Sequence, residues 1–244
     1  MAEDWDIYIC PIDDHLTSVF VDLALHDEAP QAHRPWLLRV AVSLRDPGPD
    51  GLGVPDEVDA LYAIEDDLFQ QVAESFPSRY VGRTTSQGRR ARSAERLVER
   101  VDRLRLRFPA YTFNVATILD TGWDYYFDTL FPSDLDWQTI QTRRQIDAMI
   151  EHGIDVNLPC DVVHVVRFPE PGRRIDFRNQ SEPEGFQCED FSPDEAEEHV
   201  NRFGLRLVRR DPIALEYLDG LVVDLFLRAA AGGGEYDGWT TATV

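Results

Sequence analysis

The fold of the second half is decided by residues 211–239, which read DPIALEYLDGLVVDLFLRAAAGGGEYDGW. Apolar residues recur in this stretch at helical spacing, at Leu218, Leu221, Val222, Leu225 and Ala229. Asp211 and Pro212 are typical of a helix start, and the consecutive glycines at 232–234 end the helix. We therefore expect a long amphipathic helix, followed by a last strand over residues 235–244.

The elements before this helix predict the rest of the domain. Residues 162–166 are four valines and a histidine, a composition typical of a buried strand. Residues 169–185 are polar and contain several prolines and glycines, so we expect helix only around 173–179. Two more strands are expected at 186–191 and around 203–208. The resulting order, β-α-β-β-α-β, is the ferredoxin-like pattern.

The first half also mixes strands and helices. Alternating apolar residues predict strands, and capping residues with helical apolar spacing predict two helices, one starting at Pro55 and one capped by Ser93. We therefore expect an α+β protein with two ferredoxin-like α/β sandwich domains in tandem. An aromatic stretch at 123–131 is followed by Pro132, and we place the domains at 1–131 and 132–244.

Charge and composition exclude several classes of protein. The 244 residues include 45 acidic residues and 24 basic ones, all arginine, for a net charge of −21. Such a surface repels phosphate, so we expect neither general nucleic-acid binding nor adhesion to anionic membranes. The absence of lysine excludes Schiff-base and Walker-lysine chemistry. Three scattered cysteines, and a start without the basic end of a signal peptide, favour the cytoplasm.

Motifs for catalysis are scarce. The chain contains no HExxH, GxSxG or P-loop motif, and its six histidines are dispersed, so we expect no metal site and no cofactor. The Asp13-Asp14-His15 stretch is interpreted as a polar hairpin turn, with cation binding as the alternative. His164 is interpreted as a hydrogen-bonded residue of the core or its rim. Glu65, on the apolar face of the first helix, is the best candidate for a general acid. We favour the alternative, a structural carboxylate paired with arginine.

Two charged segments are candidates for binding surfaces. Residues 182–198 contain no arginine and eight acids: Glu182, Glu184, Glu189, Asp190, Asp194, Glu195, Glu197 and Glu198. Such a segment is usually a solvated face, and it also suits docking on an arginine-rich protein. Residues 79–107 contain ten arginines and three acids. We interpret them as an outer helix face, with RNA contact as the alternative.

The end of the chain carries a resemblance. Residues 232–239, GGGEYDGW, follow the long helix and resemble the bacterial family called regulator of ribonuclease activity B, over roughly residues 160–244. The first half resembles an uncharacterised bacterial domain family at residues 5–8, 34–38 and 63–66. The resemblance implies a ferredoxin-like sandwich that binds ribonuclease E, restrains its cleavage of RNA and has no catalytic residues. One departure is that proline and glycine interrupt the first crossover helix, at 169–183.

These observations predict a cytoplasmic, non-enzymatic protein that modulates an RNA-degrading endonuclease of the ribonuclease E type through an acidic surface. Tyr236 and Trp239 are expected either to pack the last strand or to contact the partner. The predicted partner-binding residues are Glu189, Asp190, Asp194, Glu195, Glu197, Glu198, Tyr236 and Trp239. The alternative is a small-molecule enzyme or ligand-binding module with a site at the domain junction near Glu65.

Overall fold

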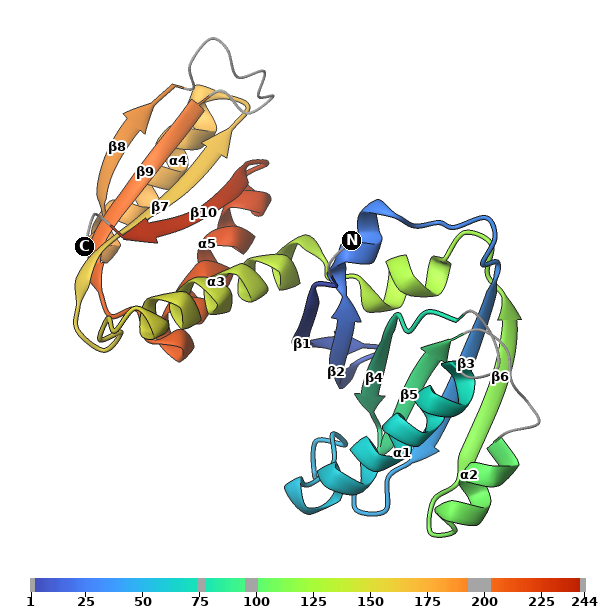
Figure 1. The fold of residues 1–244 in the computed structure, drawn as a ribbon. Coiled ribbons are helices and arrows are strands. Elements are labelled where there is room, and N and C mark those ends of the chain that lie inside the picture. Colours follow the sequence, from blue (N-terminus) through green and yellow to red (C-terminus); the bar gives the residue numbers. More distant parts are fainter. Residues whose placement is uncertain (1–2, 74–77, 95–100, 193–202, 242–244) are drawn as a thin grey trace. The chain divides into compact units, whose positions relative to one another are not determined.

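The computed structural model describes residues 3–73, 78–94, 101–192 and 203–241 (Figure 1). The chain divides into two compact units, residues 1–133 and 134–244. Each contains its own sheet, one of six strands and one of four, with helices packed on it. The protein is therefore of the mixed α+β class. In the described ranges, no helix combines the length and the apolarity needed to span a bilayer.

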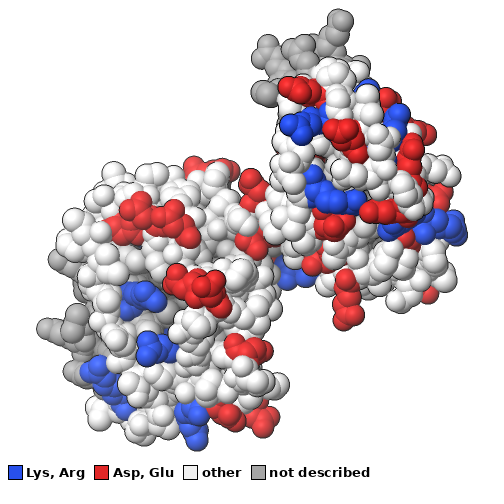
Figure 2. Space-filling view, turned by 180° about the vertical axis from the view of Figure 1, so that it is seen from behind, with Lys and Arg blue, Asp and Glu red and all other residues white. Residues whose placement is uncertain are grey.

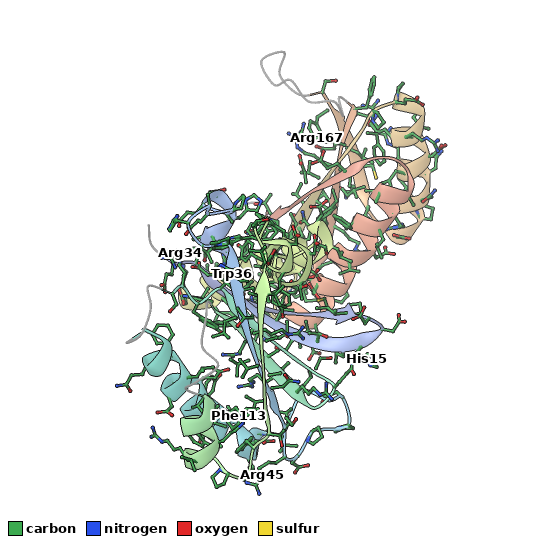
Figure 3. All side chains as sticks on the ribbon, turned by 90° about the vertical axis from the view of Figure 1, so that its right-hand side faces the viewer. His15, Arg34, Trp36, Arg45, Phe113 and Arg167 are labelled. Carbon is green, nitrogen blue, oxygen red and sulfur yellow. The ribbon has the colours of Figure 1, made fainter. Side chains whose placement is uncertain are left out.

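Unit 1 is built on an antiparallel sheet in the order β1-β2-β4-β5-β3-β6. The strands are β1 (Trp5–Ile12), β2 (His15–Asp22), β3 (Trp36–Ser43), β4 (Gly82–Ser86), β5 (Arg89–Ala94) and β6 (Phe113–Leu119). Two tight hairpins join β1 to β2 and β4 to β5. Positive φ angles at Asp13, Asp14, Gln87 and Gly88 suit the turns that match strand twist. In Figure 3, His15 marks the first hairpin, Trp36 marks the start of β3, and Arg45 lies just after its end.

The helices of unit 1 cover one face of this sheet. The α1 helix (Pro55–Ala73) begins at a proline, as expected, and α2 (Val101–Arg107) is shorter. Ser93 was expected to cap the second helix, but it lies in β5 and pairs with Arg39 of β3. Leu61, Ile64 and Leu68 of α1 pack on Leu38 and Val40 of β3. A ferredoxin-like plan is not confirmed for this unit, because its sheet has six strands and a different order. The strand order depends on pairing between strands that are far apart in sequence, and the local hydrophobic periodicity contains no information about that pairing.

Short helices cover part of the opposite face. The 3-10 helix η1 (Leu23–Asp27) follows β2, and the π-helix η2 (Tyr126–Leu130) follows β6. The Tyr126 hydroxyl donates to the carbonyl of Asp22 at 2.9 Å, and the Tyr8 hydroxyl donates to the carbonyl of Leu130 at 3.1 Å. These bonds hold η2, which lies in the aromatic stretch 123–131, against β1 and β2.

Unit 2 begins with α3 (Asp134–Glu151) and continues in β-α-β-β-α-β order. The elements are β7 (Cys160–Phe168), α4 (Pro171–Ser181), η3 (Glu182–Glu184), β8 (Gln187–Phe191), β9 (Phe203–Asp211), α5 (Leu215–Ala231) and β10 (Glu235–Thr241). All strand pairs are antiparallel, in the order β10-β7-β9-β8. Leu218, Val222, Leu225 and Ala229 of α5 are fully buried against the sheet, as their spacing predicted.

Two sequence expectations for unit 2 were wrong in detail. Pro171 does not interrupt the first crossover helix, because it stands in the first turn of α4, where the missing N–H costs nothing. Asp211 does not cap α5. It ends β9 with its carboxylate buried, accepting hydrogen bonds of 2.8 Å from Arg209 Nε and from the Tyr217 hydroxyl. The helix starts only at Leu215, after Ile213 has bonded back to Val156.

Candidate functional site

The described part of the acidic segment lies along the edge strand β8 and the turn before it. Glu182, Glu184 and Glu189 are exposed, and the Asp190 side chain is 39% exposed. The other four acids lie outside the described residues: Asp194, Glu195, Glu197 and Glu198. The predicted segment is thus a real surface feature over the part that the structure describes.

Folding brings arginines to several of these acids. Asp190 pairs with Arg174 at 2.9 Å and also with Arg178, both on α4. Glu184 accepts two bonds of 3.0 Å from Arg228 of α5. These pairs tie β8 and η3 to the helix layer, which the sequence alone did not indicate. Glu189 differs, because within the described residues it has no ion pair and stands across from Arg206 of β9 in the strand register.

Tyr236 and Trp239 lie inside unit 2, with exposed fractions of 3% and 6%. The Trp239 indole donates to the Thr142 hydroxyl on α3 at 3.1 Å, and the Tyr236 hydroxyl lies 2.8 Å from Nδ1 of His164 on β7. These contacts correspond to the packing interpretation of both residues. A partner has no access to either ring unless the core opens, so we do not retain them as contact residues.

A β-bulge explains their three-residue spacing. The register of β10 on β7 shifts between Tyr236 and Gly238, and Gly238 has a φ of +111°. Without the bulge, residues 236 and 238 would share a face. With it, both aromatic rings enter the core, and Asp237 faces outward to pair with Arg167 (labelled in Figure 3). The Asp-Gly pair therefore serves the packing of the last strand.

Burial controls the chemistry of the His164–Tyr236 pair. His164 is fully buried, and desolvation lowers its pKa from 6.5 to about 4, so the ring is neutral near pH 7. Asp211 opposes this shift and Arg209 reinforces it. Desolvation also raises the pKa of Tyr236 above its ordinary value. The pair is thus an uncharged hydrogen bond within the core, as predicted for His164.

The outer face of the four-stranded sheet carries a cluster that sequence analysis missed. The Phe191 ring lies between Arg206, 4.4 Å from its centroid, and Arg167, 5.2 Å away. It covers Gly204 so closely that an added Cβ there would fall 2.3 Å from the ring. The strand register brings Phe191 and Gly204 side by side, although twelve residues separate them in sequence.

Glu65 lies between α1 and the sheet of unit 1. Its carboxylate accepts a hydrogen bond from Arg83 of β4 at 3.0 Å and lies 3.6 Å from Arg90 of β5. Arg83 also stacks over Phe20, and Arg90 donates to the Thr85 hydroxyl at 3.2 Å. All three charged side chains are at most 11% exposed. This is the structural carboxylate that we favoured over a general acid.

The remaining candidates have structural roles. The Asp13-Asp14-His15 stretch forms the β1–β2 turn, with both aspartates at positive φ. Across the described ranges, no three or more His, Cys, Asp or Glu side chains gather as metal ligands would. Of the basic segment, Arg79 pairs with buried Asp22 at 2.9 Å and Arg107 pairs with Asp67, so folding neutralises part of it.

The geometry defines a two-unit α+β protein with a separate core in each unit. Comparison with family models matches residues 3–131 to a family of unknown function, DUF695, and residues 139–241 to regulator of ribonuclease activity B. The chain belongs to the DUF695 family, and residues 139–241 of its second half are similar to the regulator of ribonuclease activity B. Both resemblances stated from the sequence are thereby confirmed. No match was found among the curated proteins.

Proposed function

We propose that the protein regulates an RNA-degrading endonuclease of the ribonuclease E type by binding it, without catalysing a reaction itself. The observation that carries the proposal is the match of residues 139–241 to regulator of ribonuclease activity B. The match spans the whole β-α-β-β-α-β part of unit 2, so it covers a complete folding unit. We place this activity in the cytoplasm and assign it to a domain covering 132–244, beside an uncharacterised domain at 1–131.

We also infer a ferredoxin-like sandwich for unit 2. The support is its strand order, β10-β7-β9-β8, in which the first and third strands of the repeat are central and the second and fourth are edges. In the described part of unit 2 the helices pack on one face of the sheet, no described element of the unit covers the other face, and β8 is an edge strand. Both features present side chains to a partner while the helices form the core on the other side.

The proposed contact surface is the edge of β8 and the acidic residues that follow it. Residues 134–244 contain 22 acidic residues and eleven arginines, and seven of these acids fall within residues 184–198. Asp190 and Glu184 are already paired within the unit, so Glu189, Asp194, Glu195, Glu197 and Glu198 are the acids assigned to the partner. Such charges mainly raise the rate of association with a basic protein surface. Unit 2 then binds protein and not RNA, whose phosphates it repels.

The test is binding kinetics between the intact chain and ribonuclease E at low and high salt. Changing Glu195, Glu197 and Glu198 together to Gln should slow association at low salt. The difference from wild type should shrink near 1 M salt, because the Debye length there is only about 3 Å and charges farther apart are screened. A matched control changes three exposed glutamates of the same unit, Glu151, Glu170 and Glu216, to Gln. The control should associate at the wild-type rate.

Two results would overturn parts of the proposal. If both triple variants slowed association equally, the effect would come from the net charge of the protein and not from the proposed contact surface. Absence of any ribonuclease E binding by the wild-type chain would reject the assigned partner. Trp239→Ala is expected to abolish binding by unfolding the last strand, because Trp239 is buried. If the variant lost binding while unit 2 stayed fully folded, Trp239 would contact the partner after all.

A further inference from the structure

A polar groove lies on the face of the unit 1 sheet that points away from α1. Its volume is about 360 Å³, in the range of small-molecule sites. The β1–β2 and β4–β5 turns close it at one end, and the start of η2 borders it on one side. The lining residues are Ile12, Asp13, Thr17, Arg39, Thr84, Ser86, Gln87, Arg89, Ala91, Tyr125 and Thr129. A second hollow, at the start of β3, has only about 40 Å³, room for about three water molecules.

Hydroxyl groups form the floor of the groove. Thr17 and Thr84 are buried there, beside Ser86. Thr17 donates its hydroxyl proton to the carbonyl of His15 and Ser86 donates to that of Leu16, each at 3.0 Å. Both oxygens can still accept a bond from a ligand hydroxyl. The Thr84 hydroxyl makes no hydrogen bond within the described part of the chain, so it can both donate and accept.

Two arginines border this floor, and neither has an acidic partner among the described residues. Arg39 of β3 lies over the Tyr125 ring, 5.5 Å from its centroid, and Arg89 begins β5. This contrasts with Arg79, Arg83 and Arg90 of the same unit, which are all paired. The one lining acid is Asp13, so the groove is net positive in a chain of net charge −21. Figure 2 shows this side of unit 1, with arginines as blue patches.

We propose that this groove binds a phosphorylated sugar, either free or as the sugar-phosphate part of a nucleotide. A guanidinium group matches a phosphate with two parallel hydrogen bonds, and an arginine without a carboxylate partner has those donors free. The hydroxyls of Thr84, Thr17 and Ser86, with the Asp13 carboxylate, complement the hydroxyls of a sugar. The Tyr125 ring provides a flat surface at the rim, which a base would use by stacking.

The experiment is calorimetric titration of the intact chain with ribose 5-phosphate, a nucleoside 5′-monophosphate, ribose and inorganic phosphate. The phosphorylated sugars are expected to bind saturably, and at least tenfold more tightly than ribose or phosphate alone. Arg39→Gln and Arg89→Gln should each weaken binding about tenfold. Arg45→Gln is the matched control, because Arg45 is exposed just after the end of β3 and does not line the groove. It should bind as the wild type does.

The same titrations separate the two sources of the ligand. If the nucleotide binds more tightly than ribose 5-phosphate, and Tyr125→Leu removes this difference, the groove is assigned to a nucleotide. If both compounds bind equally, it is assigned to a free sugar phosphate. Thr84→Val, in a variant with unchanged thermal unfolding, should weaken both. The proposal is overturned if neither phosphorylated compound binds, if phosphate alone binds as tightly, or if the groove variants bind like Arg45→Gln.

Discussion

The buried His164 should make unit 2 sensitive to acid. Burial lowers its folded-state pKa to about 4, whereas the unfolded chain has the ordinary value of 6.5. Between these values the unfolded chain binds more protons than the folded one, so the free energy of unfolding falls as the pH falls. The stabilisation is fully present above pH 6.5 and lost near pH 4. At 1.36 kcal/mol per pKa unit, the loss is about 3 kcal/mol.

The variant that isolates this effect is His164→Gln. A glutamine does not titrate, and its side-chain oxygen can still accept the hydrogen bond of the Tyr236 hydroxyl. The free energy of unfolding of the variant should depend less on pH, and the gap from wild type should change by about 3 kcal/mol between pH 7 and pH 4. Because the two proteins share every carboxylate, the difference between them cancels the other titrations.

Hydrogen exchange of the β7 and β10 amides in the intact chain measures the stability of unit 2 alone, once the rates are corrected for intrinsic pH dependence. His152→Gln serves as a control, because His152 is an exposed histidine of the same unit. It should retain the wild-type pH dependence. Parallel stability curves for wild type and His164→Gln would contradict this prediction, since protonation of the buried ring would then cost nothing.

Two further predictions follow from packing and charge. Glu65→Gln removes the buried carboxylate that pairs with both Arg83 and Arg90, so urea unfolding of unit 1 should show a loss of stability on the order of 3 kcal/mol. A loss below about 1 kcal/mol would mean that the three charges are solvated. Gly204→Ala forces the Phe191 ring away and should cost about 1–3 kcal/mol in unit 2. The same change in a Phe191→Ala background should be nearly neutral, and an equal cost in both backgrounds would contradict the contact.

The sequence predicted the elements of unit 2 better than their contacts. The helical spacing of apolar residues from Leu218 to Ala229 correctly predicted the buried face of α5, because this spacing is a local property of the chain. Local rules misplaced Pro171 and Asp211, since each is compatible with two positions near a helix start and tertiary bonds choose between them. Residues three apart in a regular strand lie on opposite faces, so the spacing of Tyr236 and Trp239 did not predict that both rings enter the core. The β-bulge between them places both rings on the same face.

Contacts between distant residues were beyond sequence reasoning. The spacing of Asp190 and Arg174 in the sequence does not indicate their ion pair. For that reason, sequence analysis did not identify the arginines that pair with the acidic segment. The six-stranded order of unit 1 has the same origin, since β3 pairs with β5 and β6 across long intervening segments. Glu65 was placed correctly because a carboxylate on an apolar helix face almost requires a buried cation.

Regulation of ribonuclease E is tested by the initial rate of RNA cleavage by ribonuclease E in the presence of increasing amounts of the intact chain. We expect a saturable fall in rate, reached without consumption of the protein, and a weaker effect at equal concentration for the Glu195, Glu197 and Glu198 triple variant. The control triple variant should inhibit like the wild type. A cleavage rate that stays unchanged at saturating protein would mean that the chain does not regulate ribonuclease E.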